Sequence, residues 1–190
     1  MPAVARRRSD AEPVSLLLPG ILPGIVLGVG LCGFVDGILL HQVLQWHHML
    51  TSTDTDNIGV RYYSPHTVSG LEMNTVWDGI FHVVCWLAVL AGLAVLYARV
   101  TRHRRRVWTS RVLWGWILAG WGLFNLVEGI VDHHVLGVHP VRGGPHQTWW
   151  DVGFLVLGAA LLAAGHLLQL GSSRSVGHLL DGRRPRHRIP

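Results

Sequence analysis

Four long apolar segments restrict the fold of this chain more than any other feature. Residues 14–35 are 22 residues without a charged side chain, and residues 80–98 and 152–170 are apolar runs of 19 residues that each contain one histidine. A fourth run, 112–127, has 16 uncharged residues and needs the segment to about residue 138 to complete a span. A helix needs about 20 apolar residues to cross a bilayer. We expect four helices, because irregular backbone facing lipid leaves its polar groups unpaired.

The predicted fold is therefore all-α, an integral membrane four-helix bundle. The composition agrees, since 49% of the 190 residues are hydrophobic and only 14% are charged. A cytoplasmic N-terminal arm is expected over residues 1–13, and a cytoplasmic tail without fixed structure over residues 171–190, which are rich in Arg, Ser and Gly. The transmembrane domain is expected over residues 14–170, with spans at about 14–44, 76–98, 111–138 and 149–170.

The distribution of arginine predicts the orientation of the helices. The chain has no lysine, and 14 of its 16 arginines lie before the first span, between the second and third, or after the fourth. The loops on the other side carry only Arg61 and Arg142. Positive residues collect on the cytoplasmic side, so both termini are expected there, in a multi-pass protein of the cell (inner) membrane. The net charge of +5 thus reflects topology, and nucleic acid is not an expected partner.

One sequence pattern occurs twice. Residues 36–47 recur in register as residues 128–139, sharing an acid, a glycine, an isoleucine, a valine, a leucine and two histidines at a spacing of 92. The opening of the second span, residues 75–78, likewise resembles residues 148–151 at the opening of the fourth. We interpret the bundle as two parallel two-helix repeats related by a pseudo-two-fold axis along the membrane normal. Chance resemblance between apolar helices is the alternative.

Acids and histidines gather at the predicted outer ends of the helices. Such side chains are costly within a membrane and mark functional sites, and imidazole with carboxylate is a ligand set for copper, zinc or iron. Asp78 and His82 are four residues apart and share a helix face. We expect the metal ligands to be His41, Asp78, His82, Glu128 and His133, with Asp36 and Asp132 as further ligands or as hydrogen-bond partners of ligands. A network of structural salt bridges is the alternative.

The spacing within the repeated pattern raises a geometric difficulty. His41 and His133 each lie five residues after an acid, which is about 140° around an α-helix. Each histidine can share a site with its acid only if the glycine after the acid loosens the helix, or if it serves an adjacent site. His139 follows Glu128 by eleven residues, and His47 follows Asp36 by the same number. His47 is equally compatible with a solvated histidine at the membrane interface.

These motifs resemble those of a bacterial family of four-helix integral membrane proteins that is filed as a domain of unknown function. The residues that carry the likeness lie at 36–48, 78–82 and 122–139, and the likeness extends over about residues 20–170. The resemblance implies a membrane protein without an established activity. Genes of such proteins often stand beside genes for copper-dependent oxidase assembly, which favours copper as the metal and respiratory oxidase assembly proteins as partners.

The predicted function is transition-metal binding, with copper favoured and zinc or iron as alternatives, near the outer face of the membrane. Metal delivery or storage linked to respiratory oxidase assembly is the leading role. A metal-dependent membrane oxidoreductase is the first rival, so whether a reaction is catalysed stays open. A haem protein with His41 and His133 as axial ligands is the second. The lipid bilayer is the expected environment, and a homo-oligomer is compatible with the sequence.

Overall fold

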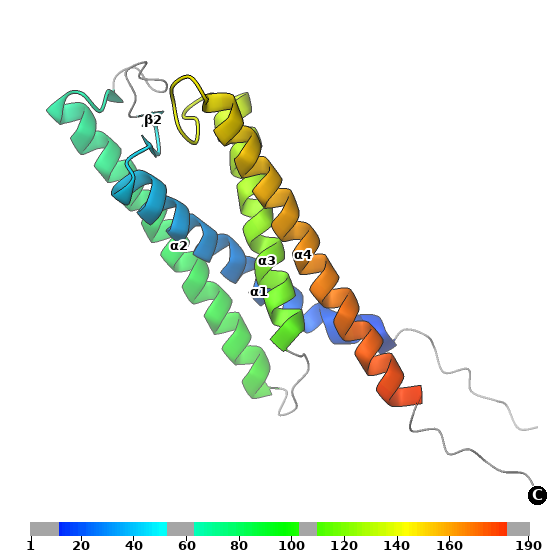
Figure 1. The fold of residues 1–190 in the computed structure, drawn as a ribbon. Helices are drawn as coiled ribbons and strands as arrows, with labels where there is room; N and C mark the ends of the chain where they lie inside the picture. The colour runs from blue at the N-terminus through cyan, green and yellow to red at the C-terminus, as the bar shows by residue number, and fades with distance from the viewer. Residues whose placement is uncertain (1–11, 53–62, 103–109, 182–190) are drawn as a thin grey trace, which may run out of the picture.

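The computed structural model describes residues 12–52, 63–102 and 110–181, and within them the chain is helical apart from one short hairpin and the connecting loops (Figure 1). Two of the helices continue into π-helical turns, labelled η1 and η3. The elements are α1 (Glu12–Asp36), η1 (Gly37–Val43), β1 (His47–His48), β2 (Thr51–Ser52), α2 (Val68–Arg102), α3 (Ser110–Glu128), η3 (Gly129–Val135) and α4 (Gln147–Asp181).

Four helices are long and apolar enough to cross a membrane, as the sequence predicted. Many large apolar side chains on α2 and α4 are exposed, among them Val83, Leu87 and Val156. An apolar surface this extensive is not stable in water, so these side chains face lipid and the protein lies in a bilayer. The spans are Ile21–Val43, Val68–Thr101, Ser110–Val135 and Gln147–Gly171. Which end faces the cytoplasm stays a prediction.

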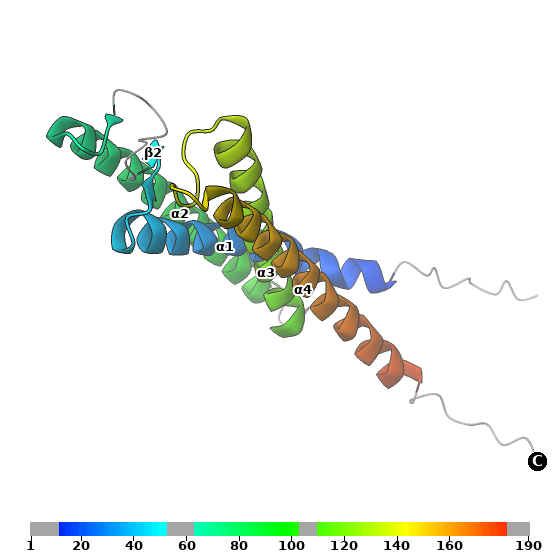
Figure 2. The same cartoon turned by 45° about the horizontal axis from the view of Figure 1, so that its top comes forward.

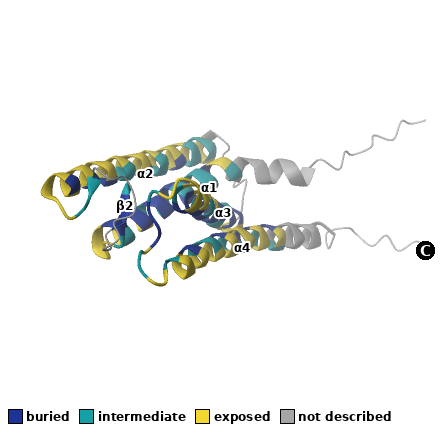
Figure 3. Cartoon of the chain, turned by 90° about the horizontal axis from the view of Figure 1, so that it is seen from above, coloured by how far each residue is buried: buried dark blue, intermediate teal, exposed yellow. Residues whose placement is uncertain are grey.

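The helices lie in the order α2, α1, α3, α4, so the two sequence halves meet through α1 and α3 (Figures 1 and 2). In the most apolar windows of α1 and α3, 50% and 44% of the residues are buried in the protein, against 11% and 17% for α2 and α4. Buried residues concentrate along α1 and α3, and the flanking helices are largely exposed (Figure 3). Among the described residues, α2 and α4 have no extensive contact with each other.

Two glycines allow α1 and α3 to cross closely. A Cβ atom added to Gly28 would collide with the carbonyl oxygen of Ile117, and one added to Gly120 would collide with that of Ile25. Small residues let membrane helices approach at the backbone. The contact is reciprocal, because each residue of one pair lies 92 positions from its counterpart in the other. It supports the predicted internal repeat, although superposition of the two halves stays a prediction.

Two helices are longer than the sequence predicted. The second begins at Val68 rather than near residue 76, and Thr67 caps it, because its hydroxyl oxygen accepts a hydrogen bond from the Gly70 amide at 3.1 Å. The fourth continues to Asp181, so residues 171–181 are helical and not a tail without structure. Leucines and a valine in that segment recur at helical spacing. Residues 1–11 of the predicted arm, Arg61, residues 103–109 and residues 182–190 lie outside the described residues.

Candidate metal centre

The π-helical turns bring each acid next to the histidine five residues later. A π-helix pairs residue i with residue i+5 through the backbone, as shown by the hydrogen bonds from Leu44 N to Leu39 O (2.8 Å) and from Leu136 N to Val131 O (2.7 Å). As a result, His41 Nε2 lies 3.2 Å from Asp36 Oδ2. The structure thus contains the loosened helix that a shared site requires, in both copies of the pattern.

A glycine begins each π-helical turn because a neighbouring helix packs against it. A Cβ atom at Gly37 would lie 2.7 Å from His82 Nε2, and one at Gly129 would lie 2.7 Å from Leu155 Cδ2. Both distances are far below a van der Waals contact, so a larger residue would push the turn away from α2 or α4. The glycine after each acid therefore fixes the position of the turn as well as its shape.

Two residues beyond each π-helical turn comes a residue with left-handed backbone, Gln45 (φ 52°) in the first copy and Gly137 (φ 58°) in the second. This conformation ends a helix and reverses the direction of the chain. Two residues later in each copy comes another histidine, His47 or His139, which the reversal directs back toward the helix end. Both of these histidines are almost fully buried.

Six buried side chains form two groups where α1 and α3 end. In Figure 1, this end of the two helices lies opposite the start of α1 and the end of α4. We call Asp36, His41 and His47 the first triad, and Glu128, His133 and His139 the second triad. Within each triad, one ligand atom per residue lies within 4.8 Å of the other two. The triads adjoin, because the rings of His47 and His139 are stacked with centroids 4.5 Å apart and planes 9° from parallel.

Backbone carbonyl groups orient two of the rings, and each carbonyl comes from the other half of the chain. His47 Nδ1 donates to the carbonyl oxygen of Val141 at 2.9 Å, and His139 Nδ1 donates to that of Met49 at 3.0 Å. A neutral imidazole with a proton on Nδ1 has its lone pair on Nε2, where it can bind a metal. We call these two hydrogen bonds the reciprocal carbonyl bonds.

Burial keeps both of these histidines neutral. Burial, and then the charge of His41, lowers the pKa of His47 to about 3. Burial, and then the neighbouring His47 and His133, also lowers the pKa of His139 well below its ordinary value. Metal ions bind the neutral ring, so at neutral pH neither histidine has to lose a proton before it can serve as a ligand.

An aspartate lies behind the other histidine of each triad. Asp78 Oδ1 lies 3.1 Å from His41 Nδ1, and Asp151 Oδ1 lies 3.6 Å from His133 Nδ1. Each aspartate also accepts a backbone amide hydrogen bond of 2.8 Å, from Met49 and from Val141 respectively. A carboxylate on the far nitrogen of a histidine fixes the ring and increases its basicity as a ligand. The sequence predicted Asp78 as a ligand, but its position suits it to orient the ring of His41 instead.

Several ligand atoms of the triads lack a hydrogen-bond partner among the described residues. Buried polar atoms are nearly always paired, and each unpaired one costs about 1–3 kcal/mol. Six such atoms lie in one cluster, and two of them, His41 Nε2 and Asp36 Oδ2, form an ion pair at 3.2 Å. The other four are atoms that a cation can bind, because a cation suits lone pairs and carboxylates alike. The atoms are Asp36 Oδ2, Glu128 Oε2 and the Nε2 atoms of His41, His47, His133 and His139.

A family model described as "Predicted membrane protein (DUF2243)" matches residues 23–172. The chain belongs to this family. No curated protein and no solved structure matches it. The predicted family is therefore confirmed, whereas the function of this family member has to be argued from its own site.

Besides Asp78, two further predicted ligands, His82 and Asp132, lie outside both triads of this family member. His82 Nδ1 donates to the carbonyl oxygen of Asp78 at 2.7 Å, which turns the ring toward its own helix, and its Nε2 faces Gly37. Asp132 is half-buried, whereas its sequence neighbour His133 is buried in the second triad. The predicted ligands His41, Glu128, His133 and Asp36 do belong to the triads.

His47 and His139 were missing from the predicted ligand set. The sequence held a signal for them, since each follows its acid by eleven residues in both copies of the pattern. A prediction from helical periodicity does not place these histidines correctly, because the chain leaves the helix at Gln45 and Gly137. Equal spacing in both copies was the better guide than position on a helix face.

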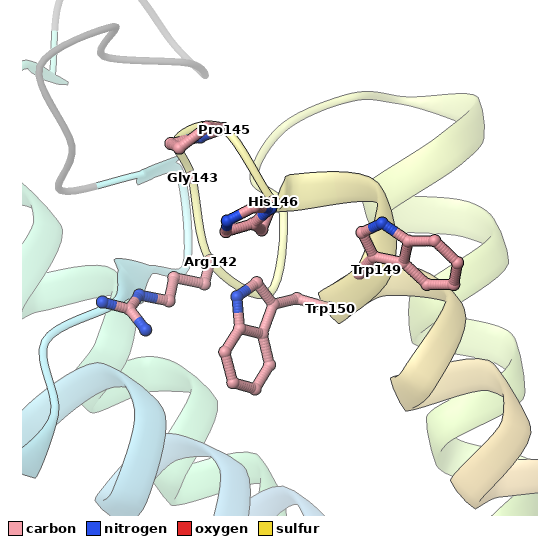
Figure 4. A pocket seen from close by; sticks show the side chains of 6 residues that line it. All are labelled: Arg142, Gly143, Pro145, His146, Trp149 and Trp150. Carbon is pink, nitrogen blue, oxygen red and sulfur yellow. The ribbon is translucent and has the colours of Figure 1, made fainter.

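A pocket of about 480 Å³ adjoins the metal centre and contains none of its triad residues (Figure 4). The guanidinium carbon of Arg142 lies 5.0 Å from the ring centre of Trp46 and 5.6 Å from that of Trp150. Such cation–π contacts hold the loop that includes Val141, whose carbonyl orients His47. The pocket is lined by Arg142, Gly143, Pro145, His146, Trp149 and Trp150.

Proposed function

We propose that this family member is an integral membrane protein that binds a transition metal at the two triads. The observation that carries the proposal is the cluster of six buried ligand atoms in the triads, four of which have neither a hydrogen-bond nor an ion-pair partner among the described residues. Four of the six are imidazole nitrogens, which suit copper as well as zinc and iron. The family resemblance favours copper, and with it a role in metal delivery or storage linked to respiratory oxidase assembly. The arginine distribution supports a site near the outer face of the inner membrane.

A second candidate function is a non-haem iron oxidoreductase. Each triad consists of two histidines and one carboxylate, and this set with open coordination positions is typical of non-haem iron(II) oxygenases. A haem protein is less well supported. The ring centroids of neighbouring histidines in the centre lie only 4.5–6.2 Å apart, so the rings pack against one another instead of flanking a macrocycle.

Elemental analysis and an absorption spectrum of the purified protein test these functions together. The protein is produced in cells supplied with copper, iron and zinc, and is purified in detergent without chelators. We expect stoichiometric copper and no intense haem band. Stoichiometric iron would favour the oxidoreductase, and a haem spectrum would favour the third alternative. If the protein takes up no transition metal even after incubation with copper, iron and zinc salts, metal binding is wrong.

A further inference from the structure

We infer that the centre holds two metal ions, one in each triad, and that the two ions bind cooperatively. This inference rests on the proposed function and specifies how the site is loaded. It requires that each triad is a site in itself, that the surrounding charge matches two ions, and that the sites are linked.

The geometry of the rings separates the two sites. Ligand atoms of one ion lie on a sphere of about 2.0–2.2 Å radius, so they are at most about 4.4 Å apart. The ligand atoms of each triad lie within 4.8 Å of one another, so one triad is about the size of the ligand shell of one ion. Lone pairs of imidazole lie in the plane of the ring. Because the planes of His47 and His139 are stacked and only 9° from parallel, their lone pairs cannot converge on one ion between them.

The charge of the centre also corresponds to two divalent ions. Four buried carboxylates surround it: Asp36, Asp78, Glu128 and Asp151. Within the described parts of the chain, three of them form ion pairs, and these pairs are only with histidines. Buried charges are stable only when compensated. Two divalent cations supply four positive charges, one for each of these four carboxyl groups, whereas one ion supplies half that number.

The reciprocal carbonyl bonds connect the two sites. When an ion fixes His47 in the first triad, it also fixes the segment that includes Met49, whose carbonyl orients His139 in the second. The converse holds through Val141 and His47. Binding of the first ion therefore orders the second site in advance. The second ion then binds without the entropy cost of ordering that segment. This is a coupling free energy between two sites, and it acts equally in both directions.

Titration of the metal-free full-length protein with Cu²⁺ tests the inference. Equilibrium dialysis should give two Cu²⁺ per chain in one steep isotherm, with a Hill coefficient between 1 and its limit of about 2 for two sites. Electron paramagnetic resonance of half-loaded protein should show mainly spin-coupled pairs, because empty and doubly loaded molecules dominate. One Cu²⁺ per chain, or two ions that load independently with uncoupled spectra, would overturn the inference and leave metal binding intact.

A single substitution gives an independent measurement of the coupling. His139→Gln removes a ligand of the second triad and leaves all three ligands of the first. We expect the affinity of the first triad for Cu²⁺ to fall at least about fivefold, the lower end of typical site-to-site coupling. His134→Gln is the matched control, because His134 is an exposed histidine outside both triads. An unchanged first-site affinity in His139→Gln would contradict cooperativity, and absence of any Cu²⁺ binding in the wild type would overturn both proposals.

Discussion

The two triads have the same internal arrangement but different surroundings. Both contain an acid, a histidine in a π-helical turn and a histidine held by a carbonyl of the other repeat. In the first copy, Asp78 also binds His48 Nδ1 at 2.6 Å, whereas the second copy has Pro140 at the position of His48. The features common to both copies are those that orient unpaired ligand atoms. The comparison thus separates the parts that would hold the proposed metal from the parts that distinguish the two triads.

The surroundings differ mainly in how firmly the π-helical histidine is held. Asp78 is fixed by two hydrogen bonds and lies 3.1 Å from His41, while Asp151 has one such bond and lies 3.6 Å from His133. A more strongly oriented ring loses less entropy when a metal binds. We therefore expect the first triad to have the higher intrinsic affinity of the two.

Loss of a π-helical histidine should have the largest effect. His41→Ala and His133→Ala should each remove the ion of their own triad and leave at most one ion per chain, because the remaining buried charges of that triad lose their compensation. The controls are the next residues in the same turns, Gln42→Ala and His134→Ala, which replace exposed side chains. Elemental analysis of the four purified variants measures the difference. Equal metal content in all four would show that the triads are not the site.

Replacement of the orienting aspartates should have a smaller effect. Asp78→Asn and Asp151→Asn keep the shape of the side chain but remove its charge, and such changes typically lower metal affinity about 10–100-fold. The loss should be greater for Asp78→Asn, since that carboxylate is closer to its histidine. Competition with a chelator of known affinity gives both values. A greater loss in Asp151→Asn would reverse the proposed ranking of the two sites.

Conversion of His82 to the residue found in the other repeat should change metal binding little. His82→Leu reproduces Leu155, which has the equivalent contact with the glycine of the other turn. The change also removes a buried nitrogen without a hydrogen-bond partner. We expect unchanged metal content and a melting temperature at or above that of the wild type. Loss of metal in this variant would restore His82 to the ligand set, where the sequence had placed it.

The smallest effect, on thermal stability, is expected from substitutions at the two left-handed positions, Gln45 and Gly137. Left-handed backbone costs a residue with a side chain roughly 1–2 kcal/mol more than glycine. Gln45→Gly should therefore stabilise the protein slightly, and Gly137→Ala should destabilise it slightly, since a Cβ atom at Gly137 meets no atom within 4 Å. Thermal unfolding of the metal-free protein in detergent tests both signs. Shifts in the same direction would mean that the two turns are not equivalent.

The fold could be predicted from the sequence because a membrane leaves few solutions for long apolar segments. The location of the site could also be predicted, because acids and histidines within such segments are exceptional. The ligand set could be predicted only in part. Asp78 and His82 share an α-helical face, but their position relative to the triads depends on packing between helices. The partner of His47 is a backbone carbonyl 94 residues away, and a carbonyl group carries no signal in the sequence.

The reciprocal carbonyl bonds also bear on the ancestry of the chain. If the two halves arose by duplication, the ancestral protein was a single helix pair, with one triad acid, one orienting aspartate, one π-helical turn and two triad histidines. In such a unit, the carbonyl that orients the last histidine would belong to another molecule. The ancestor could have completed its site only as a symmetric dimer. Fusion of the two copies would then have made permanent an association on which function already depended, and would have freed His48 and Pro140 to diverge.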